Sequence, residues 1–318
     1  MIVTPAPGAH GGDGERIARA FGFAVADVLD LSQSLNPVAQ DPRPVVARHL
    51  DAVGRYPDPM RARDALAESM GVAANRLLLT NGGAQAIALV ARELGGTVHE
   101  PEFSLHPRDG GPLWRSNPHS PSGLLAATED RAAVWDEAFY PMATGRWTRG
   151  DVDSVVVGSL TKLFACPGLR VGYVLGEPEF VARCQRHQPP WSLNGLAADA
   201  VGELLGGLDL ARVHRAIGEL RRELCAVLAR HHLSVAPSDA NWVLVAEPDL
   251  RARLAPYGIV VRDCTNFGLP GVARVAVPDR AGLARLDEVL DDLANGRPAV
   301  ATRQVDGRDA RYEKKEVT

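Results

Sequence analysis

Lys162 is the residue of this chain best suited to covalent chemistry. It follows the apolar run DSVVVGSL, and Ser159, Thr161 and Arg170 lie within eight positions of it. An amine in an apolar cleft is poorly solvated in its charged form, so burial lowers its pKa and makes it a nucleophile or base near neutral pH. The hydroxyls and the guanidinium suit the phosphate of a phosphorylated aldehyde. Taken alone, Lys162 has an alternative interpretation as a surface lysine after a strand.

Asp136 is the second candidate, because it ends the short apolar run AAVW. A carboxylate at the end of a buried strand can pair with a protonated ring nitrogen, and the ring then accepts the electrons left by bond cleavage. An unpaired buried carboxylate would be costly. A turn aspartate after a strand is the alternative for Asp136 on its own.

A glycine pair predicts an anion site. Gly82-Gly83-Ala84 follows the apolar run RLLLT and opens the helical pattern AQAIALVARELGG. Glycine lets the backbone approach a ligand, and the free N–H groups of Gly83 and Ala84 at a helix start can point at an anion. A Gly-Gly turn without further function is the alternative.

These residues need a scaffold of strands and helices. Short apolar runs separated by Gly/Pro-rich turns recur over residues 76–176, which predicts an α/β sandwich with a mainly parallel sheet between helices. A long amphipathic segment follows Pro189-Pro190, and strand and helix patterns then alternate up to the capped helix DRAGLARLDEVLDDLAN. We therefore expect a second, smaller α/β domain at the C-terminal end.

The bulk composition favours small-molecule chemistry. The 318 residues include 35 basic and 39 acidic side chains, which argues against a nucleic-acid or anionic-membrane partner. The four cysteines are widely separated, which fits reduced thiols and gives no zinc-ligand spacing. No run approaches the roughly 20 apolar residues of a membrane span, and no basic apolar leader is present. We expect a cytoplasmic protein with no membrane partner.

Taken in order, the motifs of the chain resemble those of a known enzyme fold. They are HGGD, LDLSQSLNP, YPDP, LLTNGGAQAI, NPHSPSG, DEAF, SLTKLFACPGLRVGY, PPWSLNGLA, VRDCTNFGLPG and RVAV. The chain resembles the aspartate aminotransferase-like enzymes that use pyridoxal 5'-phosphate, over nearly its whole length. Within that fold it is most similar to threonine-phosphate decarboxylases of cobalamin biosynthesis and to histidinol-phosphate aminotransferases.

The resemblance implies a division of the chain. Residues 1–30 are expected to form an N-terminal arm that packs with the small domain. Residues 31–194 form the large cofactor-binding domain, and residues 195–297 the small domain. Residues 298–318 are polar and highly charged, and we expect them to be a disordered tail.

The resemblance also assigns roles in cofactor binding. Lys162 would form the Schiff base with the cofactor and move protons at the substrate Cα, and Asp136 would pair with the pyridine nitrogen. The segments expected around the phosphate supply Gly83, Ala84, Ser159, Thr161 and Arg170. Tyr56 matches the tyrosine that reaches the cofactor phosphate of the neighbouring subunit, which implies a homodimer; a turn aromatic covering a core edge is the alternative.

For the substrate, Arg274 corresponds to the arginine that binds the α-carboxylate as a bidentate pair. His10 and Asn36 match segments that line the substrate side, and His10 would meet a substrate phosphate. A strand-face arginine and a solvated histidine are the respective alternatives. The resemblance thus implies a small, phosphorylated amino acid as substrate.

The chain departs from the family pattern at three points. Ser120 stands where an asparagine normally meets the phenolic oxygen of the cofactor. His106 replaces the aromatic residue expected to stack on the pyridine ring. Only 33 residues separate Gly83 from Asn117, and 12 separate Gly123 from Asp136, so a strand-helix unit of the large domain is expected to be lost and one helix shortened.

Three functions remain in competition. The first is decarboxylation of L-threonine O-3-phosphate, which HGGD, PPWSLNGLA and VRDCTNF favour together. The second is a histidinol-phosphate-like transamination, because that family shares the lysine and the arginine. The third is a cofactor-binding relative with lost or weak turnover, because a thinner wall around the ring would loosen control over which Cα bond breaks.

Overall fold

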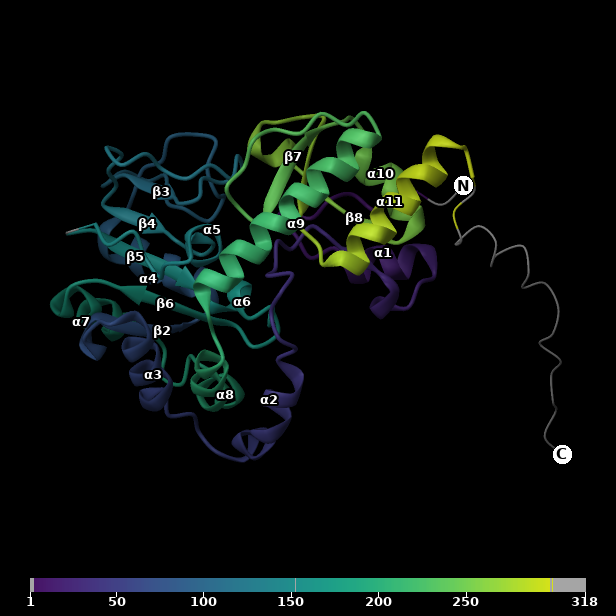
Figure 1. Ribbon diagram of the computed structural model, residues 1–318. Coiled ribbons are helices and arrows are strands. Elements are labelled where there is room, and N and C mark those ends of the chain that lie inside the picture. The colour runs from purple at the N-terminus through teal and green to yellow at the C-terminus, as the bar shows by residue number, and fades with distance from the viewer. Residues whose placement is uncertain (1–2, 152, 298, 300–318) are drawn as a thin grey trace, which may run out of the picture.

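A computed structural model describes residues 3–151, 153–297 and 299, and its large sheet lies beside a smaller sheet region (Figure 1). The large sheet has the order β2-β6-β5-β4-β3, and β6 alone runs against the other strands. Its strands are β2 (Leu77–Asn81), β3 (Trp114–Ser116), β4 (Val134–Asp136), β5 (Val155–Ser159) and β6 (Val171–Leu175). The predicted mainly parallel sheet is therefore present.

Helices cover both faces of this sheet because its strands are apolar on both sides. Along β2, Leu77 and Leu79 face one layer, whereas Leu78 faces the other. The layer that receives Leu78 contains α4 (Gly82–Leu94) and α7 (Pro178–His187). The opposite layer contains α3 (Met60–Met70), α5 (Tyr140–Thr144), α6 (Leu160–Leu163) and α8 (Gly195–Gly206). Helix α2 (Arg43–Arg48) contacts α8.

The smaller region contains two further sheets. One has the antiparallel order β7-β10-β9, and β1 pairs in parallel with β8 in the other. Their strands are β1 (Leu29–Asp30), β7 (Trp242–Ala246), β8 (Ile259–Val260), β9 (Arg262–Asp263) and β10 (Val272–Ala276). Strands β1, β7, β8 and β10 share one apolar cluster with α10 (Leu250–Leu254), α11 (Arg280–Ala294) and the second half of α9 (Leu210–Arg230). The N-terminal helix α1 (Gly14–Phe21) packs here through Ile17 and Phe21.

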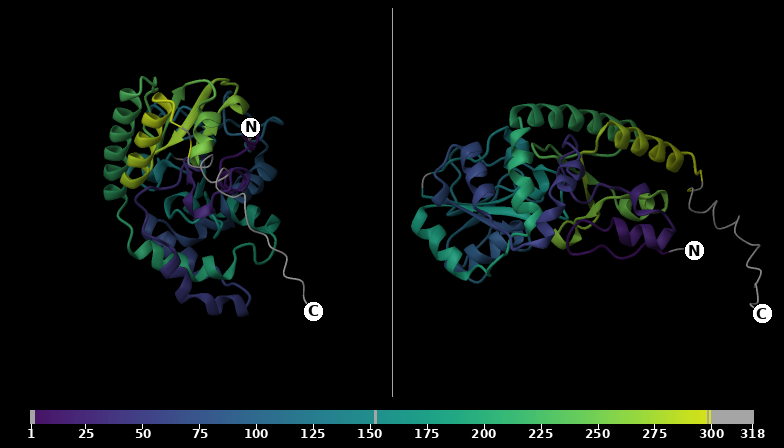
Figure 2. Two further views of the ribbon diagram at one scale, coloured as in Figure 1. Left: turned by 90° about the vertical axis from the view of Figure 1, so that its right-hand side faces the viewer. Right: turned by 90° about the horizontal axis from the view of Figure 1, so that it is seen from below.

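Helix α9 joins the two regions, as Figures 1 and 2 show. Its residue Ile217 belongs to the core of the large sheet, whereas Leu220 and Leu224 belong to the core of the small region. Helix α8 packs on α3, and its Ala197 and Val201 are buried in the large core. This packing favours a domain division within α9 rather than the boundary expected at residue 195. The tail expected from residue 298 lies outside the described residues, apart from residue 299.

The region between α4 and β4 contains little regular structure. Within the described residues, β3 is its only strand, and no helix occurs over residues 97–133. This segment, where a strand-helix unit was expected to be lost and one helix shortened, thus contains one strand and no helix. Trp114 and Trp135, both fully buried, fill the two faces of the sheet beside this region. None of the described helices is long and apolar enough to cross a membrane.

Candidate active site

A cavity of about 290 Å³ opens at the carboxyl ends of β2, β4 and β5. Parallel strands bring their carboxyl ends to one edge of a sheet, which is where open α/β sheets bind ligands. The N-terminal arm and the small sheet β7-β10-β9 complete the cavity from the other side. The lining residues include His10, Ser32, Gln33, Gly83, Ala84, Phe103, Leu105, Ser120, Asp136, Phe139, Ser159, Thr161, Lys162, Arg170, Arg262 and Arg274.

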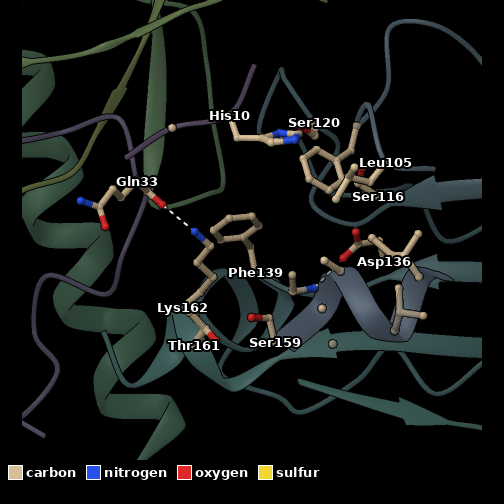
Figure 3. Close-up of a pocket in the computed structure, with 18 of the residues that line it drawn as sticks. His10, Gln33, Leu105, Ser116, Ser120, Asp136, Phe139, Ser159, Thr161 and Lys162 are labelled. Atoms are coloured by element: carbon tan, nitrogen blue, oxygen red, sulfur yellow. Dashed lines mark hydrogen bonds between the residues drawn. The ribbon is translucent and has the colours of Figure 1, made fainter. Parts of the chain in front are cut away.

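Lys162 enters this cavity from α6, directly after β5 (Figure 3). Its amine donates a hydrogen bond to the main-chain carbonyl of Gln33 at 2.9 Å and lies 5.9 Å from the ring centroid of Phe139. Burial, followed by the positive charges of Arg274 and Arg170, lowers the pKa of Lys162 to about 8. About a tenth of this amine is therefore uncharged at pH 7, far more than for an exposed lysine, and the uncharged amine is the nucleophile.

Asp136 lies at the end of β4 and also lines the cavity. One of its carboxylate oxygens accepts a hydrogen bond from the main chain of Ala138 at 3.0 Å, and the other lies 3.0 Å from Nε2 of His106. These two contacts hold the carboxylate in one orientation. It is thus preorganised to meet a cationic ring nitrogen.

The predicted anion site is formed by two chain segments, which we call the phosphate cup: Gly83, Ala84, Ser159, Thr161 and Arg170. Gly83 and Ala84 occupy the first turn of α4, whose N–H groups have no partner within the helix. The Arg170 guanidinium lies against Gly82, which has φ +74°, and a β-carbon at Gly82 would collide with it. Within the described residues, Arg170 has no acidic partner.

Thr161 contributes less to the cup than its sequence position indicates. Its hydroxyl is buried and exchanges hydrogen bonds of 3.2 Å with the main-chain N–H and carbonyl of Val171. These bonds tie the turn after Lys162 to the start of β6. Ser159, in contrast, makes no hydrogen bond through its hydroxyl within the described residues, so this group is available to a ligand.

Two buried arginines form the opposite side of the cavity. Arg262 on β9 and Arg274 on β10 are register partners, and they are only 7% and 5% exposed. Burial, followed by the charge of Arg262, lowers the pKa of Arg274 to about 9. The Nε atoms of both side chains have no partner in the described residues. Like charges on facing positions destabilise a sheet, so this pair fits a site that receives an anion.

The arm residue His10 reaches the rim of the cavity. Its ring lies 5.9 Å from that of Phe103, and partial burial, together with Arg262 and Lys162, lowers its pKa. Gly11 packs so closely on the carbonyl of Ser32 that a β-carbon would overlap it. This contact explains why glycine follows His10, because it lets the arm approach residues 32–33.

The predicted roles of His106 and Asn36 do not fit this arrangement. His106 is fully buried behind Asp136 rather than in the cavity, so it cannot stack on a bound ring. Phe103 and Leu105, from the same segment, line the cavity instead. The Asn36 side chain donates to the carbonyl of Leu163 at 2.8 Å and lies outside the cavity. This bond fixes the segment that follows Lys162, and Ser32 and Gln33 line the cavity instead of Asn36.

Ser120 and Tyr56 lie at the periphery of the site. Ser120 is buried and lines the cavity, and its hydroxyl makes no hydrogen bond within the described residues. Tyr56 is 76% exposed, lies outside the cavity of its own chain and stacks on the exposed Trp191 at a centroid distance of 4.5 Å. An exposed position is compatible with a contact to a second subunit, so the predicted role of Tyr56 stays a prediction.

Comparisons with known proteins decide the family. The sequence profile of "Aminotransferase class I and II" matches residues 113–290. The chain belongs to this family. Threonine-phosphate decarboxylase of Salmonella typhimurium is 30% identical, with 91% of this chain and 97% of the relative covered. Histidinol-phosphate aminotransferase 1 of Dechloromonas aromatica is 27% identical, with 86% and 92% covered.

Among solved structures, the histidinol-phosphate aminotransferase of Sinorhizobium meliloti in complex with pyridoxal 5'-phosphate matches with a TM-score of 0.76. It is 16% identical, and the match covers 92% of this chain and 96% of the relative. The fold is therefore that of the aspartate aminotransferase-like enzymes. The match to the Salmonella enzyme extends over 356 positions, more than this chain contains, so the relative has segments that are missing here.

Members of this family are pyridoxal phosphate-dependent enzymes, and the cavity fits that cofactor. The lysine amine, the unpaired Arg170 guanidinium and the Asp136 carboxylate match, in kind, the aldehyde, the phosphate and the pyridine nitrogen of the cofactor. When bound, the cofactor supplies an electron sink for cleavage of a bond at the substrate Cα.

Several lining residues were missed from the sequence. Arg262 sits within GIVVRDC, where a charged residue interrupts a buried apolar run. That interruption, opposite a second arginine on β10, is a signal for an anion site. Phe103, Ser32 and Gln33 gave no comparable signal, because only the folded backbone brings them to the cavity.

Proposed function

We propose that this protein is a pyridoxal phosphate-dependent enzyme that decarboxylates L-threonine O-3-phosphate or a closely similar phosphorylated amino acid. The observation that carries the proposal is the buried pair Arg262 and Arg274, which faces Lys162 across one cavity. Two guanidiniums without acidic partners call for two anionic groups on the ligand. A phosphorylated α-amino acid carries both a carboxylate and a phosphate, whereas histidinol phosphate carries only the phosphate.

In this proposal each residue has a defined task. Lys162 holds the cofactor covalently and delivers a proton to the substrate Cα, and Asp136 keeps the pyridine nitrogen protonated. The phosphate cup binds the cofactor phosphate through main-chain N–H groups, Ser159 and Arg170. Arg274 binds the substrate carboxylate, and Arg262 with His10 binds the substrate phosphate. Ser120 meets the phenolic oxygen of the cofactor.

We also propose that the enzyme is a homodimer in which Tyr56 contacts the cofactor phosphate of the other subunit. Support comes from exposed apolar side chains that lie close to one another in sequence or space: Leu50, Val53, Tyr56, Met60 and Trp191. Soluble monomers rarely expose such groups together. Analytical ultracentrifugation tests the state, and a monomer at micromolar concentration would exclude the shared site.

The decisive experiment separates the candidate reactions on one preparation. Purified protein loaded with pyridoxal phosphate is mixed with L-threonine O-3-phosphate, and carbon dioxide and aminopropanol phosphate are measured. Turnover above that of Lys162→Ala supports decarboxylation. No carbon dioxide above that control would exclude it.

A histidinol-phosphate-like aminotransferase is the second candidate, favoured by the 27% identical relative and by the same arginine pair, which would bind the carboxylates of a dicarboxylic amino donor. It predicts that glutamate alone converts the bound cofactor to its amine form, which changes the absorption spectrum. A third outcome, cofactor binding with no reaction on either compound, would indicate a relative that has lost turnover through its shortened domain.

A further inference from the structure

Trp242 is a buried aromatic residue to which the site described so far gives no role. It is fully buried at the start of β7 and does not line the cavity. Side chains alternate between the two faces of a strand, and the next residue, Val243, belongs to the apolar core of the small region. Trp242 therefore points to the opposite face of the small sheet.

The guanidinium of Arg274 lies over the ring of Trp242. Trp242 pairs with Ala276 on β10, so Arg274 is its diagonal neighbour on the same face of the sheet. The central carbon of the guanidinium is 4.9 Å from the centroid of the ring. Within the described residues, the Arg274 side chain has neither a hydrogen bond nor an ion pair, so an aromatic face stabilises its charge where a carboxylate would be expected.

An aromatic ring and a carboxylate hold a guanidinium in different ways. A carboxylate accepts from the N–H groups along the edge of the planar cation, and those groups would then be lost to a ligand. A ring attracts the cation through its flat face and leaves the N–H edge free, and the attraction is stronger where water is excluded. Trp242 thus holds Arg274 in place without blocking it.

Trp242 is itself fixed by residues of the large-sheet region. Its indole N–H donates to the main-chain carbonyl of Pro121 at 2.9 Å, and its ring packs edge-on against Phe139 at a centroid distance of 4.7 Å. Phe139 lines the cavity beside Lys162 (Figure 3). The ring therefore connects Arg274, on the small sheet, to the side of the cavity that carries Lys162.

The neighbouring arginine, Arg262, provides an internal comparison. Its guanidinium lies 4.6 Å from the ring centroid of Phe267, and it also donates to the main-chain carbonyl of Ala9 at 3.3 Å. Both arginines thus rest on an aromatic ring. Among the described residues, Arg262 has a further partner, whereas Arg274 depends on its ring alone.

We propose that Trp242 is a positioning residue that presents the N–H edge of Arg274 to the carboxylate of the substrate. The inference rests on the proposed function, in which Arg274 binds that carboxylate. If Trp242 only filled space, an aliphatic side chain would serve equally well. Removal of the aromatic face should instead weaken the binding of a carboxylate and leave the binding of a phosphate unchanged.

The test compares two ligands that have no amine and therefore cannot react with the cofactor. Phosphooxybutanoate is threonine phosphate without its amino group, and sec-butyl phosphate has a methyl group in place of the carboxylate. Isothermal titration calorimetry on protein loaded with pyridoxal phosphate gives both dissociation constants, and their ratio measures the contribution of the carboxylate. In Trp242→Leu, we expect this contribution to fall about tenfold, the order of a desolvated cation–π interaction.

Three further variants separate positioning from packing. Trp242→Phe keeps an aromatic face, so the carboxylate contribution should stay within about threefold of the wild type. In an Arg274→Met background, which lacks the cation, Trp242→Leu should leave the contribution unchanged. Phe267→Leu is the matched control, because it removes the ring beside Arg262 and should weaken both ligands equally.

A second measurement reads Arg274 directly in the wild type. Its Nε–H signal in the NMR spectrum should lie upfield of those of exposed arginines, because the guanidinium lies over an aromatic ring, and Arg274→Met assigns the signal by its loss. Phosphooxybutanoate should shift this signal further than sec-butyl phosphate does. The absence of an upfield signal would overturn the inference even if Trp242→Leu does not fold.

Equal weakening of the two ligands in Trp242→Leu would also overturn the inference, because it would mean that Trp242 supports only the packing of the site. Equal binding of the two ligands by the wild type would have a different meaning. It would refute the carboxylate site on Arg274, which is a failure of the proposed function, and the inference would fall with it.

Discussion

Two sides of the cavity within the large domain are built in different ways. The phosphate cup and Lys162 follow regular strands, because β2 leads into α4 and β5 leads into α6. The side formed by residues 97–125, which we call the outer wall, contains only the three-residue strand β3. Here side-chain contacts replace secondary structure: Asn117 accepts from Ala126, and His119 contacts the carbonyl of Pro101.

The difference shows which part of a site tolerates shortening. Strand ends fix their residues through backbone hydrogen bonds to neighbouring strands, so the cup does not depend on the missing unit. The outer wall depends on buried side chains, in particular Trp114 and Glu102. We therefore expect substitutions in the cup to affect cofactor chemistry and substitutions in the wall to affect stability first.

The largest effect is expected for Lys162→Ala, which should abolish turnover, because no other amine lines the cavity within the described residues. The chain has only three lysines, Lys162, Lys314 and Lys315, which makes the assignment simple. Borohydride reduction followed by peptide mass spectrometry should find the cofactor on Lys162. The double variant Lys314→Ala, Lys315→Ala should keep both label and turnover; cofactor found mainly on those two lysines would refute the site.

The second expected effect is on the stability of the outer wall. Trp114 is fully buried, and its indole N–H donates to the carbonyl of Gly95 at 3.0 Å. Trp114→Ala should lower the free energy of unfolding by about 3–5 kcal/mol, measured by urea denaturation, because it leaves a large cavity. Leu124→Ala, at a half-exposed position in the same wall, should cost within about 0.5 kcal/mol. Equal losses for the two variants would mean that Trp114 does not hold the wall.

The third effect concerns Glu137, the residue directly after β4. Burial raises the pKa of Glu137 to about 7, and its carboxyl group accepts a hydrogen bond from the main chain of Arg149 at 3.0 Å. The folded protein therefore binds more protons than the unfolded chain between about pH 4.5 and 7, so this group makes stability fall as pH rises through that window.

Glu137→Gln removes this titration while keeping an acceptor for Arg149. Relative to the wild type, we expect it to gain about 2 kcal/mol of stability at pH 8 compared with pH 5. Urea unfolding at the two pH values measures the gain. A difference from the wild type that is the same at both pH values would exclude a titrating Glu137.

The smallest effects come from a matched pair of serines, one on each side. Ser159→Ala should weaken pyridoxal phosphate binding by about tenfold, because it removes a hydrogen bond to a charged phosphate. Ser120→Ala should weaken it by about two- to fivefold, because it removes a hydrogen bond to the phenolic oxygen from a less rigid wall. Equilibrium dialysis measures both. A larger loss for Ser120→Ala would reverse the proposed ranking of the two sides.

The sequence by itself determined the regular parts of this protein. The apolar run before Lys162 and the glycine pair before α4 predicted a strand and a helix start, because burial on both faces and helix N-termini leave clear patterns. The resemblance to a known family, and not the local patterns, predicted that Lys162, Asp136 and Gly83 share one site, and the cavity contains all three. The loss of a strand-helix unit was predicted because two spacings are shorter than in the family that the chain resembles.

Only the tertiary structure decided which side chains line the cavity and which lie behind it. From their sequence positions, His106 and Asn36 were expected to line the site. In the structure, His106 lies behind Asp136, and the Asn36 side chain donates to the main-chain carbonyl of Leu163, next to Lys162. Arg262 became a site residue because antiparallel pairing sets it opposite Arg274. Cavity lining depends on side-chain direction and on contacts between segments far apart in sequence, and neither has a local pattern from which it can be predicted.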